Sequence, residues 1–248
     1  MADEAEYKNG VFERNGKEKP IKLSRSRIEL FLECPRCFYL EKKLKIYRPS
    51  QLPFTLNSAV DRLLKQEFDL YRERGIAHPL IRNYHIDAIP ARHESLNEWR
   101  NTNKGVQFFH QPTNFLIYGA IDDLWQNSQG EYIVVDYKAT SQFSDIIQLD
   151  KKWHQQYKRQ IEIYQWLLRK NGFLVSPLAY FVYCNAKTFN KVFNGRLEFD
   201  VRIIPYEGND EWVEGVLFEI YKCLQSSQIP IPSPYCEYCN YVEAIKET

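Results

Sequence analysis

The chain of 248 residues lacks a long apolar run: nowhere do about 18 apolar residues follow one another, so we expect no transmembrane helix and no membrane partner. The first residues, Met-Ala-Asp-Glu-Ala-Glu, are acidic and contain no apolar segment of the kind that a secretory signal needs. We therefore expect a cytoplasmic, reducing location. There, the six cysteines are expected to be metal ligands or buried thiols rather than disulfides.

The sequence also lacks a strong charge of either sign. Its net charge of +1 excludes a basic coat over the whole surface, so any surface that binds nucleic acid must be local. One stretch gathers basic residues and is either a phosphate-binding track or a solvated helix face: Arg25, Arg27, Arg36, Lys42, Lys43, Lys45 and Arg48. Four aromatic residues could either stack on unpaired bases or belong to the core: Trp125, Tyr137, Trp153 and Tyr157.

No internal repeat and no clear linker divide the chain, so we expect a polar arm over residues 1–20 and a single domain over residues 21–248. Apolar periodicity predicts helices from Ser26 onward with a break at Pro35, and over residues 56–74, 153–171 and 212–224. Strands are predicted at residues 118–125, 131–140, 178–184 and 197–205. This order predicts an α/β fold in which helices flank a mixed central sheet.

Charged residues interrupt two of the predicted strands, which a polar hairpin joins. Asp122 lies on the first strand, and Asp136 and Lys138 lie on the second, two residues apart and therefore on one face. Charges at the edge of an apolar core are costly unless something uses them. Two carboxylates beside a lysine suit a Mg²⁺ ion next to a phosphate. The alternative is a solvated hairpin edge that carries a surface ion pair.

Two further patterns accompany this pair of strands. On the predicted helix that follows, Gln160 and Tyr164 are four residues apart and share one face, so an amide and a phenol could meet the same nucleotide. Near the two ends of the chain stand Cys34-x-x-Cys37 and Cys236-x-x-Cys239. Two such pairs can complete one tetrahedral thiolate site and so tie the chain ends together.

The motifs Gly119-x-x-Asp122, Asp136-x-Lys138 and Gln160-x-x-x-Tyr164, in this order, resemble the PD-(D/E)xK nuclease superfamily and specifically its RecB-type exonuclease branch. The resemblance implies a restriction-endonuclease-like core and Mg²⁺- or Mn²⁺-dependent hydrolysis of DNA. The expected substrate is single-stranded DNA, cut from an end in repair or recombination.

The resemblance also implies a role for each motif residue. Asp122 and Asp136 would bind the metal ion together with the backbone carbonyl of Tyr137. Lys138 would position or activate the attacking water, and Gln160 and Tyr164 would hold the substrate strand.

One position departs from that branch, whose members often carry a metal-binding histidine on an early helix. Asp61 stands about where that histidine would be, and an aspartate can also bind Mg²⁺. Alternatively, Asp61 is an ordinary helix residue paired with Arg62 or Lys65. If so, a catalytically silent DNA-binding or scaffold module becomes the rival hypothesis.

The segment Ser24-Arg-Ser-Arg-Ile-Glu-Leu-Phe-Leu-Glu-Cys-Pro35 resembles the iron–sulfur nucleases of the same branch, including CRISPR-associated and helicase–nuclease members. This resemblance implies a 4Fe-4S cluster on Cys34, Cys37, Cys236 and Cys239, and a helicase or a CRISPR adaptation protein as partner. A CRISPR spacer-processing nuclease is thus a further alternative. Two early and two late cysteines depart from the usual one and three, so Zn²⁺ is a serious alternative to the cluster.

Overall fold

The computed structural model describes residues 19–49, 55–142, 148–189 and 192–246, together with the backbone of residues 6–8 and 11–13. Most of the expected polar arm, residues 1–20, lies outside these ranges. Within it, β1 (Glu6–Lys8) and β2 (Val11–Glu13) pair as a short antiparallel hairpin.

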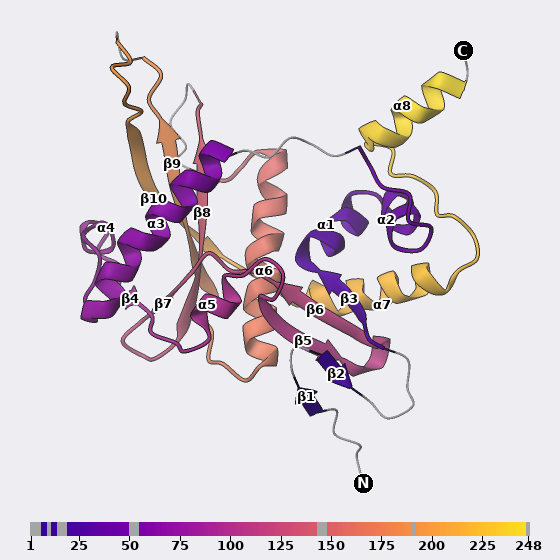
Figure 1. Cartoon of the computed structure of the whole chain (residues 1–248), viewed down its shortest axis with the longest axis horizontal. Coiled ribbons are helices and arrows are strands. Elements are labelled where there is room, and N and C mark those ends of the chain that lie inside the picture. The colour runs from indigo at the N-terminus through magenta and orange to yellow at the C-terminus, as the bar shows by residue number, and fades with distance from the viewer. Residues whose placement is uncertain are drawn as a thin grey trace.

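The central sheet has five strands in the order β10-β9-β8-β7-β4 (Figure 1). Its middle strand β8 (Tyr132–Thr140) runs parallel to β9 (Leu178–Ala186) and antiparallel to β7 (Asp123–Gln126). The outer strands are β10 (Phe199–Glu207) and β4 (Ile89–Pro90), both antiparallel to their neighbours. The expected α/β fold with a mixed, helix-flanked sheet is therefore confirmed.

Both faces of β8 are buried. Ile133 and Val135 belong to the apolar cluster that includes Phe68, whereas Val134 belongs to the cluster that includes Ile161. Phe68 lies on α3 (Thr55–Arg74) and Ile161 on α6 (Gln155–Lys170), and both helices contact β8. Alternate side chains of a strand point to opposite faces, so this continuous apolar run requires a helix on each side.

A second sheet of three strands has the order β3-β6-β5. The central strand β6 (Phe115–Gly119) is parallel to β3 (Ile21–Ser24) and antiparallel to β5 (Val106–His110). Because α6 contacts β5 and β6 as well as β8, this helix joins the two sheets into one framework.

The predicted strand over residues 118–125 is wrong in one respect. It is two strands in different sheets, because β6 ends at Gly119 and β7 begins at Asp123. Between them the amide of Ile121 donates a hydrogen bond to the carbonyl of Trp99, at the end of α5 (Leu96–Trp99), with an N···O distance of 3.1 Å. Asp122 thus lies in the break between strands rather than on a strand.

The remaining helices complete the structure. Pro35 separates α1 (Arg25–Glu33) from α2 (Pro35–Lys42) as predicted. It stands at the first position of α2, where a backbone N–H would have no partner within the helix, so proline costs no hydrogen bond there. The helix predicted after Asp210 is α7 (Trp212–Gln225). The sequence reading did not foresee α4 (Pro79–Asn83) or α8 (Glu237–Lys246).

The two ends of the described chain lie side by side. Figure 1 shows α1 and α2, in indigo, next to α7 and α8, in yellow tones. The hydroxyl of Tyr39 donates to the carbonyl of Ser226 at 3.1 Å, and the guanidinium of Arg36 pairs with Glu243 at 2.7 Å. In the described part of the chain, no helix combines the length and the apolar character needed to cross a membrane.

Candidate active site and cysteine cluster

The structure brings the motif carboxylates together where β7 and β8 begin to separate. Asp136 is fully buried on β8, and the side chain of Asp122 keeps 21% of its exposure. The backbone amide of Tyr137, next to Asp136, donates a 3.0 Å hydrogen bond to Oδ2 of Asp122. This bond fixes the Asp122 side chain against β8 even though Asp122 itself is outside the strand.

Lys138 connects these carboxylates to α6. Its ammonium is paired with Asp136 and donates a 3.4 Å hydrogen bond to Oε1 of Gln160. The amide of Gln160 in turn donates to the hydroxyl of Tyr164 at 3.1 Å. Burial by itself would lower the pKa of Lys138, but the charges of Asp136 and Asp122 outweigh it and raise that pKa. Lys138 is therefore a cation at neutral pH.

The buried charge of Asp136 is only partly compensated by the residues around it. Among the described residues, neither of its carboxylate oxygens accepts a well-aligned hydrogen bond, although the Lys138 ammonium is adjacent. Burial raises the pKa of Asp136 to about 7, Lys138 opposes that shift, and the charge of Asp122 adds to it. Burial also acts to raise the pKa of Asp122, but Lys65, Lys138 and the Tyr137 amide outweigh it, so that pKa is lowered.

These features fit a hard divalent cation. A carboxylate that is buried and lacks hydrogen bonds gains most from a positive charge, and oxygen is the donor that Mg²⁺ prefers. Asp122 offers such oxygens to the cavity, and the buried carboxylate of Asp136 lies behind it beside Lys138.

Asp61 shares the ammonium of Lys65 with Asp122. The ammonium of Lys65, one turn along α3, lies 2.8 Å from Oδ2 of Asp61 and 3.2 Å from Oδ1 of Asp122. The Lys65 pair considered for Asp61 is therefore present, but it lies inside the site instead of on an open helix face. Burial, and then the charge of Asp122, raise the pKa of Asp61 against the effect of Lys65.

Asp123, the residue after Asp122, is directed into the protein. It is fully buried, is paired with Arg72, and accepts a 2.7 Å bond from Arg100 and another of 2.7 Å from the hydroxyl of Tyr137. With two arginines and a phenol satisfying it, Asp123 serves the core rather than the cavity.

The motif residues other than the fully buried Asp136 line two adjoining cavities of about 480 and 320 Å³. Both are bounded by Arg25, Asp61, Asp122 and Gln160. The sequence analysis named Arg25 only as part of a basic stretch and Lys65 only as a possible partner of Asp61, and assigned neither to this cavity. Two signals could have found them, since Arg25 stands inside the matched segment that begins at Ser24, and Lys65 is four residues after Asp61.

Gly119 is required by the Tyr164 ring. A Cβ atom at Gly119 would stand 2.6 Å from Cε1 of Tyr164, well inside contact distance. The glycine at the end of β6 and the tyrosine on α6 are thus two sides of one packing contact. A side chain at position 119 would therefore require the Tyr164 ring to move.

The four motif cysteines form the second site. The Sγ atoms of Cys37 and Cys236, and those of Cys37 and Cys239, are 3.6 Å apart, and those of Cys34 and Cys239 are 3.8 Å apart. All four sulfur atoms lie within 4.8 Å of one another, and all four residues are buried. Arg48 donates to Cys236 at 3.4 Å. Within the described residues, these cysteines are the one group of three or more potential metal ligands whose atoms all lie within 4.8 Å of one another. The carboxylates of the active-site cavity do not form such a group.

The family model of the PD-(D/E)XK nuclease superfamily matches residues 22–244, which is most of the chain, and the chain therefore belongs to that superfamily. The comparison with curated proteins gave no match. A solved structure titled "Crystal structure of SSO0001" is 18% identical, with a TM-score of 0.41, over 92% of this chain and 87% of that one.

Proposed function

We propose that this member of the superfamily is a Mg²⁺- or Mn²⁺-dependent deoxyribonuclease of the RecB type that degrades single-stranded DNA from an end. The observation that carries the proposal is Asp136, a fully buried carboxylate that is paired with Lys138 and whose oxygens accept no well-aligned hydrogen bond from the described residues. A structural aspartate in this core would be satisfied by protein donors, as Asp123 is.

In this proposal each residue has a separate task. Asp122, Asp136 and the carbonyl of Tyr137 hold the divalent ion, which when bound lowers the pKa of water and offsets charge on the phosphate. Lys138 orients the attacking water, because its ammonium lies between Asp136 and Gln160. Arg25, which lines both cavities, is placed to bind a phosphate oxygen of the strand.

Gln160 and Tyr164 have a positioning task. Their mutual hydrogen bond fixes the amide so that its oxygen accepts from Lys138. The substrate strand would meet the free sides of this pair where the two cavities adjoin. Asp61 is proposed as a further metal ligand that Lys65 neutralises until the ion binds.

For the cysteine site we propose a single tetrahedral ion, with Zn²⁺ favoured over the 4Fe-4S cluster. A Zn–S bond of about 2.3 Å in a tetrahedron places sulfur atoms about 3.8 Å apart. Three of the six sulfur pairs, at 3.6 and 3.8 Å, agree with that spacing, and no pair is more than 4.8 Å apart. A four-iron cluster puts a separate iron behind each thiolate, and therefore needs the sulfur atoms further apart.

A catalytically silent DNA-binding module remains a second candidate, and one contact favours it. Lys65 already neutralises Asp61 and Asp122, as a lysine would if it replaced a lost metal ion. Within the nuclease proposal, repair with a helicase partner and CRISPR spacer processing use the same chemistry.

The deciding experiment measures cleavage of end-labelled single-stranded DNA with Mg²⁺, Mn²⁺ or excess chelator. The nuclease proposal expects release of mononucleotides or short oligonucleotides from one end, in the presence of metal only. Tight DNA binding without any cleavage in either metal would support the silent module instead.

A further inference from the structure

We propose that the DNA strand leaves the active-site cavity along the start of α6 and reaches Tyr235, with Tyr157, Trp153 and Tyr235 stacking on successive unpaired bases. This proposal rests on the proposed function, because it specifies the path of that nuclease's single-stranded substrate. We call these three aromatic residues, with Lys151 and Lys152, the strand track.

A continuous series of contacts connects the track to the active site. The ammonium of Lys138 lies 4.6 Å from the ring centre of Tyr157, which itself lines the larger cavity. From Tyr157 the ring of His154 is 5.9 Å away, and the ring of Trp153 is 5.3 Å beyond that. The track thus begins at Tyr157, beside Lys138, which is proposed to act in catalysis.

The series then continues to the C-terminal segment. The ammonium of Lys151 is 4.8 Å from the ring centre of Trp153, and that of the next residue, Lys152, is 4.3 Å from the ring centre of Tyr235. Aromatic rings with ammonium groups beside them suit a single strand, because rings stack on bases of any sequence and ammonium groups meet phosphates.

Exposure separates the track from the core aromatics. Trp153 and Tyr235 retain 48% and 78% of their exposure, whereas Trp125 and Tyr137 retain 0% and 6%. Of the aromatic residues considered for base stacking in the sequence, Trp125 and Tyr137 are therefore structural. A large exposed ring held beside a lysine is available to a ligand without any rearrangement of the core.

The helix itself favours an anionic strand at this place. Trp153 lies in the 3₁₀ turn Lys152–His154 that leads directly into α6, a helix of 16 residues. The dipole at a helix N-terminus attracts phosphate, although the amides of His154 and Gln155 already bond to the carbonyls of Lys151 and Lys152. Tyr157 and Gln160 lie on the first turns of the same helix, so a strand that follows this face is led to the catalytic lysine.

The cysteine site gives the far end of the track a fixed position. Tyr235 directly precedes Cys236, and the amide of Cys236 bonds to the carbonyl of Ser233 at 3.0 Å. A metal ion on the four cysteines would therefore hold the Tyr235 ring in place against Lys152. In this proposal the cysteine site therefore contributes to substrate binding by fixing Tyr235.

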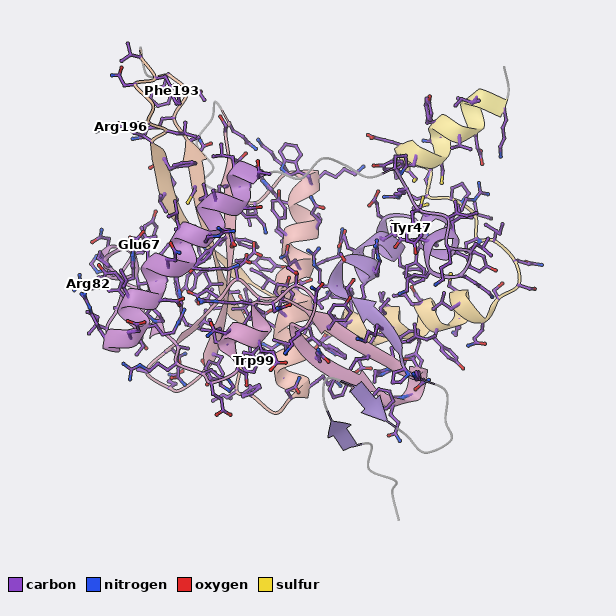
Figure 2. All side chains as sticks on the ribbon, viewed as in Figure 1. Tyr47, Glu67, Arg82, Trp99, Phe193 and Arg196 are labelled. Atoms are coloured by element: carbon purple, nitrogen blue, oxygen red, sulfur yellow. The ribbon has the colours of Figure 1, made fainter. Side chains whose placement is uncertain are left out.

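The test measures the affinity for a fluorescein-labelled oligothymidylate of 12 nucleotides by anisotropy, in an Asp136→Asn background that cannot cleave it. Trp153→Ala and Tyr235→Ala are expected to weaken binding by about 5- to 150-fold each, the range that corresponds to loss of one base-stacking ring. Trp153→Phe and Tyr235→Phe keep a ring and should bind within about threefold of the parent. Phe193→Ala is the matched control, because Phe193 is also an exposed aromatic but lies at the tip of the β9–β10 connection (Figure 2).

A second measurement separates the track from the nuclease proposal. With Asp136 restored, the Ala variants should cleave a trinucleotide at the parent rate and the 12-nucleotide strand more slowly at limiting concentration, since only the longer strand reaches Tyr235. If no variant or parent cleaves anything, the proposed function fails while the anisotropy result still judges the track. Binding of the 12-nucleotide strand that is unchanged in both Ala variants would overturn the track, whatever the cleavage result. Circular dichroism melting of each variant excludes unfolding as the cause of a loss.

Discussion

Asp122 and Asp123 are consecutive residues whose carboxylates lie in opposite environments. Asp122 faces the cavity and contacts Lys65, whereas Asp123 is fully buried between Arg72 and Arg100. The break between β6 and β7 makes this possible, because Asp122 lies before the strand and Asp123 begins it. One of the pair is therefore available for chemistry, and the other holds the framework.

Substitution of these two residues should separate stability from activity. Asp123→Ala removes the buried carboxylate that Arg72 and Arg100 share and leaves them only the more exposed Asp69, and is expected to cost about 3–5 kcal/mol of unfolding free energy. Asp122→Asn keeps the shape of the side chain, and should alter that free energy little while abolishing cleavage. Urea denaturation of both variants measures the difference. Equal stability losses for the two would contradict the assignment of Asp123 to the core.

Lys138→Ala should abolish metal-dependent cleavage and leave the affinity for single-stranded DNA within a few-fold of the parent. The reason is that its ammonium lies against Asp136, where the water would be positioned, whereas the strand has many other contacts. Single-turnover cleavage and anisotropy on the same preparation give both values. The control is Lys104→Ala, an exposed lysine paired with Glu98. Cleavage by the Lys138 variant at the parent rate would remove this lysine from the mechanism.

Substitutions of Asp61 and Lys65 should shift the Mg²⁺ concentration needed for cleavage in opposite directions. Asp61→Ala removes a proposed ligand and should raise the Mg²⁺ concentration for half-maximal cleavage by about tenfold or more. Lys65→Met removes a cation that competes for Asp122 and should lower it. A titration of activity against Mg²⁺ measures both.

The double variant Asp61→Ala with Lys65→Met distinguishes a ligand from a mere partner of Lys65. A ligand at Asp61 predicts that the double variant still needs more Mg²⁺ than Lys65→Met does. If the two behave alike, Asp61 acts only through Lys65 and binds no metal.

The cysteine cluster should contain one tetrahedral ion per chain and should stabilise the contact between the chain ends. Cys236→Ser is expected to lower the melting temperature and to release that ion, whereas Cys223→Ser, at a cysteine outside the cluster, should do neither. Metal analysis with an absorption spectrum of protein purified without oxygen supplies the readout. A colourless protein with one zinc agrees with the sulfur spacing. A brown protein with iron and absorption near 400 nm, about where such clusters absorb, would overturn it.

The sequence was informative where local pattern and spatial arrangement coincide. The continuous apolar run of β8 and the periodicity of α3 and α6 predicted those elements, because burial on a known face imposes a period. The pairing of Cys34-x-x-Cys37 with Cys236-x-x-Cys239 was predicted from ligand spacing, and the structure brings all four sulfur atoms together.

Other features depend on contacts between distant residues and leave no local pattern. The break at Asp122 depends on a hydrogen bond from Ile121 to Trp99, and α8 gains its place through Arg36 and Glu243. Lys65 was named only as an ion-pair partner for Asp61, because nothing local shows that it also reaches Asp122 across the cavity. The role of Tyr235 likewise requires the contact with Lys152.

The most direct test of a metal-dependent nuclease centred on Asp136 is isothermal titration of Mn²⁺ into the parent and Asp136→Asn proteins, with cleavage of labelled single-stranded DNA measured on the same samples. The account predicts that the parent binds Mn²⁺ at this site and cleaves only when it is bound, and that the Asn variant does neither while keeping its fold. Unimpaired cleavage by the folded Asn variant would contradict the central claim.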